Sequence, residues 1–504
     1  MSLNAKSSRG PGLLEVSDGL WEREVDDEDD YGGELGGVMH AADTPFTAAV
    51  KAEAHPVIEG NASLRSTLFN TINAIVGAGV LALPYALRLD GAVVGTLLIL
   101  LVAGLSERSA AMLLWVSDAT KQRLYAGIGG AVGGPILGKV VDVAVILQNL
   151  GLLIGYLVIC GDLIPEFVAY SRGDTDAGEG TIDWQFRAII LAVLSAVVFL
   201  PLSSLKSLDA LRFTTIVGLV CVLVFVASAI ALGSMTAADP HTVPCDATRG
   251  EIRIWPTTFV GVLQSAPLMF FSFVAHNTIL LLYGELKRQR DPERESKFPS
   301  KRDKMNFVVR VSLVVCALLY GLSSLFSYSM FRDVTSQDVF VDFGPRAFPF
   351  MAWVKMAYAI VIIFSFPIIA FALRRSLHNL IFGTGHVPTT MHAVVESAFV
   401  VAISALVGIF VPAVSTVFGL TGALTATNIM YIFPAGFFLV LHARHKAQKA
   451  KDPTSVSLPE PPKGLWYWAV VVFCVGVFVF VGSTTGVILG MVSPAASSSC
   501  VQGA

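Results

Sequence analysis

Eleven long apolar segments, separated by short polar connections, dominate the pattern of this chain. They lie near residues 67–88, 92–115, 139–165, 185–203, 211–233, 257–283, 307–331, 348–373, 391–411, 416–441 and 464–491. Each is about as long as the 20 or so apolar residues that cross the hydrocarbon core of a bilayer. Because lipid offers no partner for free backbone amides, each segment is expected to be helical. The pattern predicts an all-α polytopic membrane protein with about eleven transmembrane helices.

Polar stretches flank these segments and suggest a division of the chain. Residues 1–65 are polar and contain the acidic run "EREVDDEDD", which predicts a disordered cytosolic tail. A ten-helix core is expected at 66–441, a basic cytosolic loop at 442–463, and the eleventh helix with a short outer tail at 464–504. Two interpretations of the acidic tail stay open: a solvated tail without a specific role, and a regulatory segment.

Composition supports the bilayer and excludes several other classes of protein. The 504 residues are 54% hydrophobic and only 14% charged, whereas a soluble domain carries roughly 25% charged residues. A net charge of −3 gives no reason to expect a nucleic-acid partner. The six cysteines are scattered without a CxxC pair. No structural metal and no cofactor are therefore expected.

The basic residues of the connections predict an orientation. Lys and Arg concentrate in alternate connections, and "KRQRDPERESKFPSKRDK", residues 287–304, supplies many of them. Because such residues accumulate on the cytoplasmic side, we expect a cytosolic N-terminus. With eleven segments the C-terminus then lies outside or in a lumen.

The first segment contains residues that interrupt a helix. It reads "NAIVGAGVLALPYA" at 73–86, with Gly77, Gly79 and Pro84 close together. A helix that unwinds in the membrane is tolerated only where its backbone faces protein or a water-filled cavity. In secondary transporters such breaks bind substrate and coupling ions. Glycines that merely let helices pack closely are the alternative.

The sixth segment carries a second interruption. Pro267, Ser272, His276 and Asn277 lie within its apolar run. If the first five segments form one repeat, the sixth is the counterpart of the first, and broken helices of transporters occur in such corresponding positions. Two interrupted helices five segments apart therefore favour a transporter.

Five segments in order carry a family resemblance. They read "LFNTINAIVGAGVLALPYA", "ILQNLGLLIGYLVICGDLIPE", "FSFVAHNTILLLYGELK", "FSFPIIAFALRRSL" and "VFGLTGALTATNIMYIFPAGFF". Over about residues 66–441 the chain resembles the amino acid/auxin permease family, including sodium-coupled neutral amino acid transporters and vacuolar amino acid transporters. The resemblance implies a five-plus-five inverted repeat with broken helices one and six, working by alternating access.

The resemblance also implies a substrate site at the two breaks. One end of a zwitterion needs amide donors and the other needs carbonyl acceptors, and unwound helices present both. The residues expected to bind substrate are Ile75, Val76, Gly77, Ala78, Gly79, Ser272, Phe273, Val274 and Ala275.

The identity of the coupling ion stays open between sodium and the proton. The sodium-coupled relatives place an ion at positions that match Asn73 and Ser365, although they usually carry threonine at the second. Amide, hydroxyl and carbonyl oxygens suit a hard cation. Proton coupling needs a titratable group, for which His276 lies deepest in a segment and has a suitable ordinary pKa. Other candidates within segments are Glu107, Arg108, Asp142, Lys355 and Glu396.

One departure from the sodium-coupled relatives concerns the connection between the fifth and sixth segments. Those relatives tend to carry a long, glycosylated, cysteine-bearing loop there. Here residues 234–256 are short and contain Cys245 but no sequon. This favours a vacuolar or lysosomal type of membrane over the plasma membrane without deciding between them. Whether Cys245 pairs with Cys500 also stays open.

These observations predict a secondary active transporter of amino acids, most consistent with small or neutral substrates and driven by a proton or sodium gradient. The alternative is a non-transporting amino-acid sensor that uses the same pocket. No enzyme is expected, because HExxH, serine-nucleophile motifs and paired intramembrane aspartates are absent from the sequence. The expected partners are the amino acid and the bilayer, with regulatory partners of the tail unassigned.

Overall fold

The computed structural model describes residues 62–173, 184–205, 212–239, 250–287, 298–345, 347–383, 386, 389–411, 413–451 and 458–492. Within these ranges the regular structure is helical, apart from one isolated bridge between Ala62 and Leu286. The predictions for the acidic tail up to residue 61, for Cys245 and for Cys500 lie outside the described residues.

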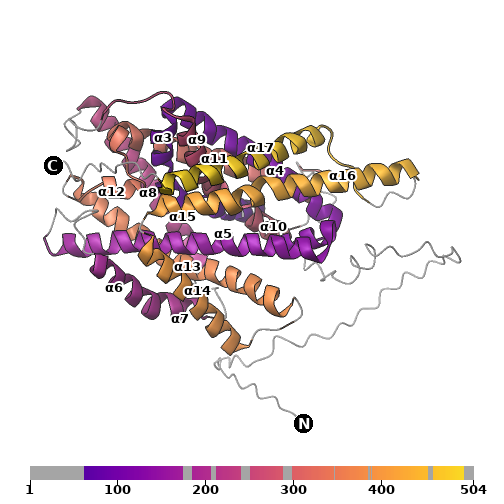
Figure 1. The fold of residues 1–504 in the computed structure, drawn as a ribbon, viewed down its shortest axis with the longest axis horizontal. Coiled ribbons are helices and arrows are strands. Elements are labelled where there is room, and N and C mark those ends of the chain that lie inside the picture. Colours follow the sequence, from indigo (N-terminus) through magenta and orange to yellow (C-terminus); the bar gives the residue numbers. More distant parts are fainter. Residues whose placement is uncertain are drawn as a thin grey trace, which may run out of the picture. The chain divides into compact units, whose positions relative to one another are not determined.

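Membrane-spanning helices account for most of the described chain (Figure 1). Ten helices in it are long and apolar enough to cross a bilayer, and there are eleven when the bent pair Leu64–Ile75 and Gly79–Asp90 counts as one span. All eleven predicted segments coincide with these spans. The predicted all-α polytopic fold is therefore confirmed, and the spans are numbered one to eleven below.

The elements of spans one to five are α2 (Leu64–Ile75), the 3₁₀ turn η1 (Ala78–Leu81), α3 (Leu83–Asp90), α4 (Ala92–Thr120), α5 (Tyr125–Ser171), α6 (Trp184–Leu194), the π turn η2 (Ser195–Phe199), α7 (Leu200–Ser203) and α8 (Arg212–Ala238). Those of spans six to eleven are α9 (Phe259–Phe273), α10 (His276–Glu285), α11 (Lys301–Phe331), η5 (Arg332–Val334), α12 (Val339–Asp342), α13 (Pro349–Phe382), α14 (Thr390–Phe410), α15 (Val414–Thr421), the π turns η6 (Gly422–Ala426) and η7 (Asn428–Ile432), α16 (Phe433–Lys451) and α17 (Leu465–Val492).

Several helices extend past the apolar segments that predicted them. Helix α16 continues to Lys451, so residues 442–451 of the expected basic loop are helical. Helix α5 begins at Tyr125 and bends at Gly134, whose φ of 82° places it in the left-handed region. Hydropathy marks where lipid ends, whereas Ala, Lys and Gln are good helix formers in water as well. The helix ends therefore lie beyond the apolar limits.

Spans one and six run in opposite directions. Beside the start of α2, the Ala62 amide donates to the Glu285 carbonyl and the Lys287 amide donates to the Ala62 carbonyl, both at 3.0 Å. At the other end of the span, the Ala92 amide donates to the Arg253 carbonyl at 2.8 Å. The beginning of each span thus meets the end of the other, as an inverted repeat requires.

The helix contacts repeat the same relation across the rest of the fold. Span five (α8) packs on span seven (α11), and its counterpart span ten (α16) packs on span two (α4). Span five also packs on span eight (α13), just as span ten (α15) packs on span three (α5). Each contact therefore has its equivalent in the other half. The predicted five-plus-five arrangement is confirmed.

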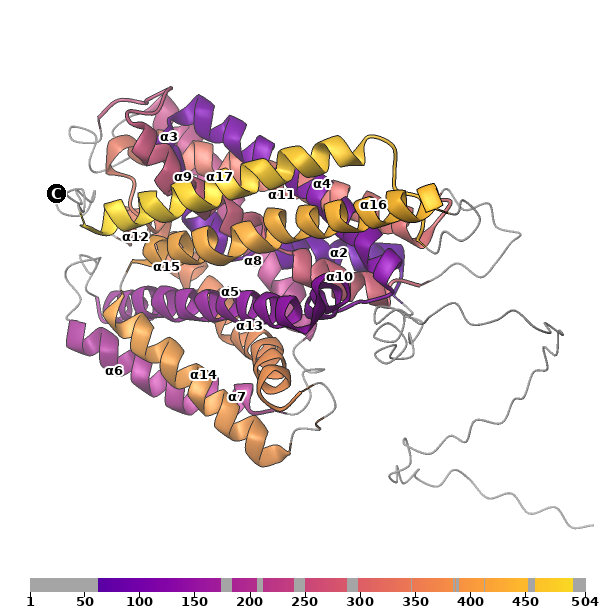
Figure 2. The same ribbon diagram turned by 45° about the vertical axis from the view of Figure 1, so that its right-hand side comes forward.

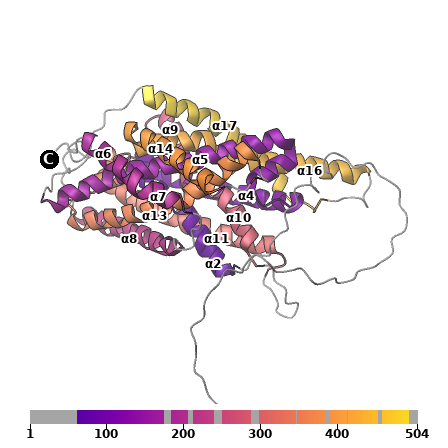
Figure 3. The same cartoon turned by 90° about the horizontal axis from the view of Figure 1, so that it is seen from below.

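Two groups of spans follow from these contacts. The bundle contains spans one, two, six and seven, namely α2–α3, α4, α9–α10 and α11. The scaffold contains spans three, four, eight and nine, namely α5, α6–α7, α13 and α14, which lie together in Figure 2. Within the bundle, α2 lies beside α11, as Figure 3 shows from another side.

Candidate functional site

The first break interrupts span one at Val76 and Gly77. Helix α2 ends where the Val76 amide donates to the Ile72 carbonyl at 2.8 Å. Gly77 is then extended (φ −126°, ψ −157°), and η1 begins at Ala78. The two halves of the span differ in direction by 49°. Pro84 lies in the first turn of α3, where its missing N–H needs no partner.

The second break interrupts span six at Val274 and Ala275. Helix α9 ends at Phe273, Val274 has an extended ψ of 107°, and α10 begins at His276. The breaks predicted for spans one and six are therefore both present. In each, residues that the sequence places in one apolar run adopt non-helical backbone.

The two breaks touch each other. A Cβ atom added to Gly79 would lie 2.7 Å from Ser272 Cα, which is closer than real Cβ contacts come. The Ser272 hydroxyl is occupied within its own helix, donating to the Leu268 carbonyl at 2.8 Å. Glycine at 79 is therefore needed for the close approach of the two backbones.

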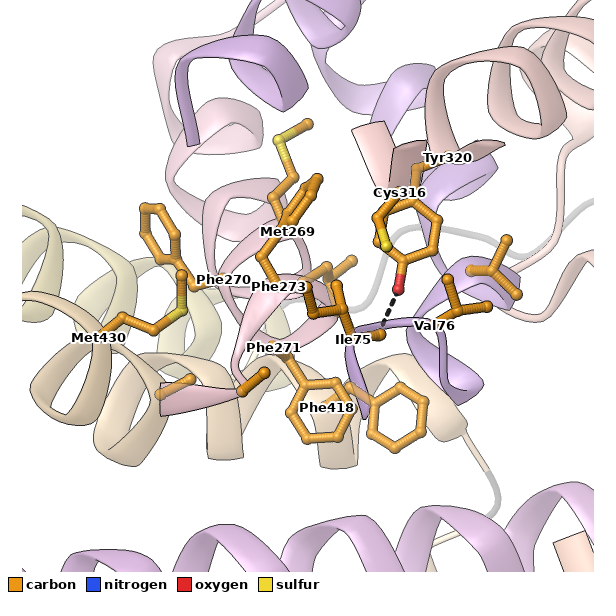
Figure 4. Close-up of a cluster of buried hydrophobic side chains, with 14 of the residues drawn as sticks. Ile75, Val76, Met269, Phe270, Phe271, Phe273, Cys316, Tyr320, Phe418 and Met430 are labelled. Atoms are coloured by element: carbon orange, nitrogen blue, oxygen red, sulfur yellow. Dashed lines mark hydrogen bonds between the residues drawn. The ribbon is translucent and has the colours of Figure 1, made fainter. Parts of the chain in front are cut away.

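Tyr320 of α11 connects the breaks. Its hydroxyl lies 2.6 Å from the Ile75 carbonyl (Figure 4). The same hydroxyl lies 3.0 Å from the Ser272 carbonyl. One hydroxyl has one proton to share between these acceptors, so the pair of carbonyls keeps accepting capacity for another donor. Tyr320 was not predicted from the sequence, where its only signal is a phenol within an apolar segment.

Tyr358 of α13 is a scaffold residue that contacts the first break. Its hydroxyl lies 3.4 Å from the Gly77 carbonyl. The space beside Gly77 is open, because a Cβ atom added there would meet nothing within 4 Å. The first break is therefore bordered by a bundle tyrosine, a scaffold tyrosine and unfilled space.

The structure brings the two predicted substrate-binding runs together. Six of the nine residues are buried and two are half-buried, whereas only the backbone of Ala78 is described. The buried ones are Ile75, Val76, Gly79, Ser272, Phe273 and Ala275; the half-buried ones are Gly77 and Val274.

Aromatic side chains surround the breaks. Phe271 stacks on Phe418 of span ten with ring centroids 4.1 Å apart. Phe273 meets Tyr320 edge to face at 5.1 Å, and Figure 4 shows Met269 and Met430 nearby. Such surroundings exclude water and strengthen the interactions of the free backbone groups.

Asn73 of the candidate sodium site faces α8, and α13, which carries Ser365, meets the same part of α8. The position of a Cβ atom on Gly218 of α8 lies 3.7 Å from Asn73 Oδ1 and 3.1 Å from Val361 Cγ1. Ser365 lies one helical turn beyond Val361 and two turns beyond Tyr358, so these three share a face of α13. Spans one and eight thus approach each other at the level of Asn73.

The candidate proton carrier is buried at the second break. His276 begins α10 and is 1% exposed. Neither ring nitrogen makes a hydrogen bond of ordinary geometry among the described residues, although the Ser106 backbone lies close enough to interact with the ring.

Each of the other titratable candidates, except half-buried Asp142, has a charged or titratable partner among the described residues. Lys355 Nζ contacts both Glu166 oxygens at 2.8 and 2.9 Å. Glu396 Oε1 and His378 Nδ1 are hydrogen-bonded at 2.6 Å.

Two further candidates, Glu107 and Arg108, form an ion pair at 3.2 Å. Among the described residues no group of three or more His, Cys, Asp or Glu side chains is arranged to hold a metal ion.

Comparison with known proteins gives concordant matches. The family described as transmembrane amino acid transporter protein matches residues 60–489. Amino acid transporter AVT6A of Arabidopsis thaliana is 30% identical, covering 80% of this chain and 85% of the relative. Amino acid transporter AVT6B of the same plant is 28% identical, covering 78% and 85%. The crystal structure of MhsT in complex with L-phenylalanine aligns with a TM-score of 0.51 and 13% identity, covering 85% of this chain and 99% of that one.

Proposed function

Because the chain belongs to the transmembrane amino acid transporter family, we propose that it moves an amino acid across its membrane by alternating access, as a secondary active transporter. Membership confirms the resemblance to the amino acid/auxin permeases. The chain is accordingly an integral membrane protein of a family of transporters rather than of enzymes. The substrate class, the coupling ion and the direction of transport are proposals.

The meeting of the two breaks at Tyr320 carries the proposal. A zwitterionic substrate would place its amine on the carbonyls of Ile75 and Ser272, which share the single proton of that hydroxyl. Its carboxylate would face backbone amides where η1 and α10 begin, because a helix N-terminus favours an anion. The open space beside Gly77 would receive the substrate.

The residue types at the breaks support a neutral substrate. Residues 73–79 and 272–276 contain no Asp, Glu, Lys or Arg. A charged substrate side chain buried there would lack a partner at the breaks, and an unpaired buried charge is strongly unfavourable. Small or neutral amino acids are therefore the proposed class.

Coupling to a sodium or a proton gradient is proposed through different residues. Asn73 and Ser365 would hold sodium where span one faces span eight, supported by the approach of Asn73 and of Val361, one helical turn before Ser365, to Gly218. His276, whose ring lies where α10 begins at the second break, would carry a proton. Uptake with each gradient imposed separately distinguishes the two.

Alternating access would move the bundle against the scaffold. The first break contacts both groups, through Tyr320 and Tyr358, so a relative movement would open the space beside Gly77 to one side or the other. We place the N-terminus in the cytosol and the C-terminus outside or in a lumen, in a vacuolar or lysosomal-type membrane or the plasma membrane.

The first test is uptake of radiolabelled amino acids into proteoliposomes with sodium and pH gradients imposed separately. Wild-type protein should accumulate a neutral amino acid with one gradient. Gly77→Leu should abolish binding and uptake, because leucine would fill the open space at the break. The matched control is Gly130→Leu on α5, where a side chain also meets nothing within 4 Å; it should transport normally.

Two outcomes would contradict the proposal. Intact uptake by Gly77→Leu would remove the first break from the binding site. Binding of amino acids without uptake under any gradient would favour the sensor, which would use the same pocket without moving its ligand.

A further inference from the structure

A groove lies between α4 and α11 of the bundle, and the residues of the two breaks are not part of its lining. Its volume is about 330 Å³. Leu100 and Leu318 on its walls are more than half exposed within helices that span the membrane, so the groove opens toward lipid. The residues of its apolar part include Leu100, Ala103, Gly104, Leu313, Ala317 and Leu318.

One end of the groove is charged. Glu107 Oε1 accepts from Arg310 Nη2 at 2.8 Å and Nε at 3.1 Å, and Glu107 Oε2 lies 3.2 Å from Arg108 Nε. The carboxylate side chain is 14% exposed, whereas those of Arg310 and Arg108 are 62% and 43% exposed. Glu107 and Arg310 line this end of the groove, and Arg108 adjoins it through Glu107. Two guanidiniums share one carboxylate, so this end keeps a net positive charge.

The charged end lies at the level of a membrane interface. Residues 311–331 of α11, between Arg310 and Arg332, carry no charge, and at 1.5 Å per residue they extend about 31 Å. This matches the roughly 30 Å of a hydrocarbon core. The Arg108 guanidinium lies 5.4 Å from the ring of Trp468, next to the exposed Trp466 and Tyr467. Tryptophan and tyrosine gather at such interfaces.

We propose that this groove binds an anionic phospholipid of the surrounding membrane. One acyl chain would lie along Gly104 and Ala317, and the phosphate would lie on Arg108 and Arg310. Among the described residues neither guanidinium makes a further hydrogen bond or ion pair, so donors stay available for phosphate oxygens. Basic sites between membrane helices at an interface bind lipid head groups in this way.

Charge complementarity decides between lipid classes. A phosphatidylcholine head group is neutral overall, and its choline would meet the same positive charge that attracts its phosphate. A head group with a net negative charge gains from both arginines. The bound leaflet is the one on the side of the basic connection 287–304, where α11 begins.

The proposal is tested on the full-length protein in detergent by native mass spectrometry and thermal unfolding. Phosphatidylglycerol and phosphatidylcholine with identical acyl chains are the probes. Phosphatidylglycerol should bind more tightly and raise Tm further. Arg108→Gln and Arg310→Gln should each weaken its binding roughly fivefold, since one basic residue near a membrane surface contributes about that factor. Arg375→Gln, an exposed arginine on α13, is the control and should change nothing.

The apolar part of the site has its own test. Gly104→Leu should weaken phosphatidylglycerol binding by filling the groove, because a side chain there meets nothing within 4 Å and the arginines stay in place. Gly130→Leu is the matched control at an open helical glycine outside the groove. Any general effect of leucine on helix stability would appear in both variants.

Three results would overturn the proposal. Equal binding of the two phospholipids would remove the role of head-group charge. Normal binding by the arginine variants or by Gly104→Leu would move the lipid elsewhere. Full competition by inorganic phosphate would show that the arginines hold a soluble anion instead of a lipid.

Discussion

At the scale of single residues, the contact between Gly79 and Ser272 controls how closely the two broken helices approach. Gly79→Ala would place a Cβ atom 2.7 Å from Ser272 Cα, so one backbone must move. We expect a loss of stability of about 1–3 kcal/mol, as for other overpacked interiors, and at least a tenfold loss of uptake per folded molecule. Thermal unfolding and proteoliposome uptake measure the two effects.

Gly77→Ala is the control for stability. Its added methyl group meets open space and its φ of −126° suits any residue, so its Tm should equal that of the wild type. Equal stability and uptake in Gly79→Ala would show that the two breaks do not need their close contact.

Tyr320 gives a second prediction at this scale. Tyr320→Phe keeps the ring but removes the hydroxyl between the Ile75 and Ser272 carbonyls. Leaving buried acceptors without their donor should reduce stability by about 1–3 kcal/mol. We also expect a higher KM for uptake, because the carbonyls are no longer held in position.

Tyr328→Phe on the same helix is the matched control. The Tyr328 hydroxyl accepts from the Arg253 amide at 3.0 Å, away from the breaks. The Tyr328→Phe variant should lose stability, while its KM for uptake should stay unchanged. A rise in KM for both variants would assign the effect of Tyr320 to general loosening of α11.

At the scale of elements, a buried ion pair joins the long scaffold helices α5 and α13. The side chains of Lys355 and Glu166 are 2% and 11% exposed. Lys355→Met should destabilise the protein by about 3–5 kcal/mol, because it leaves the buried carboxylate without its partner. Adding Glu166→Leu should recover most of that loss, since an apolar pair of similar size can replace a buried ion pair.

Thermal unfolding of the four proteins in this double-mutant cycle measures the coupling. Lys449→Met is the control, since Lys449 forms an ion pair with Glu460 on the surface, where the side chains are 55% and 79% exposed. It should leave Tm unchanged. Additive losses in the cycle would mean that the α5–α13 contact does not depend on this pair.

At the scale of the whole molecule, the distribution of basic residues predicts the orientation in the membrane. An N-glycosylation sequon inserted in the connection at 240–249 should be modified, and the same insertion at 288–297 should not. The first connection lies on the predicted outer side, and the second belongs to the basic cytosolic side. A shift in electrophoretic mobility that glycosidase reverses reports modification. The opposite pattern would invert the orientation.

The span number and the place of the breaks were predictable because their causes are local. About 20 apolar residues in a row must span a bilayer as a helix, and the glycines and polar residues near positions 77 and 274 interrupt that run. The start of α5 was not predictable because residues 125–138 are rich in glycine, and the end of α16 was not predictable from hydropathy because its last turns are polar. His276 was found as a titratable residue within an apolar segment, whereas Asn73 and Ser365 were named from the family resemblance, and the roles of all three stay predictions.

The sequence by itself therefore determined the membrane class, the spans, the two interruptions and the family. Only the tertiary structure decided what each polar group meets. Tyr320 reaches Ile75 across 245 residues and Lys355 reaches Glu166 across 189, and the lipid-facing groove exists only where α4 lies against α11. Hydropathy acts within one helix, whereas these contacts depend on how separate helices pack, and no local pattern in one chain encodes that pairing.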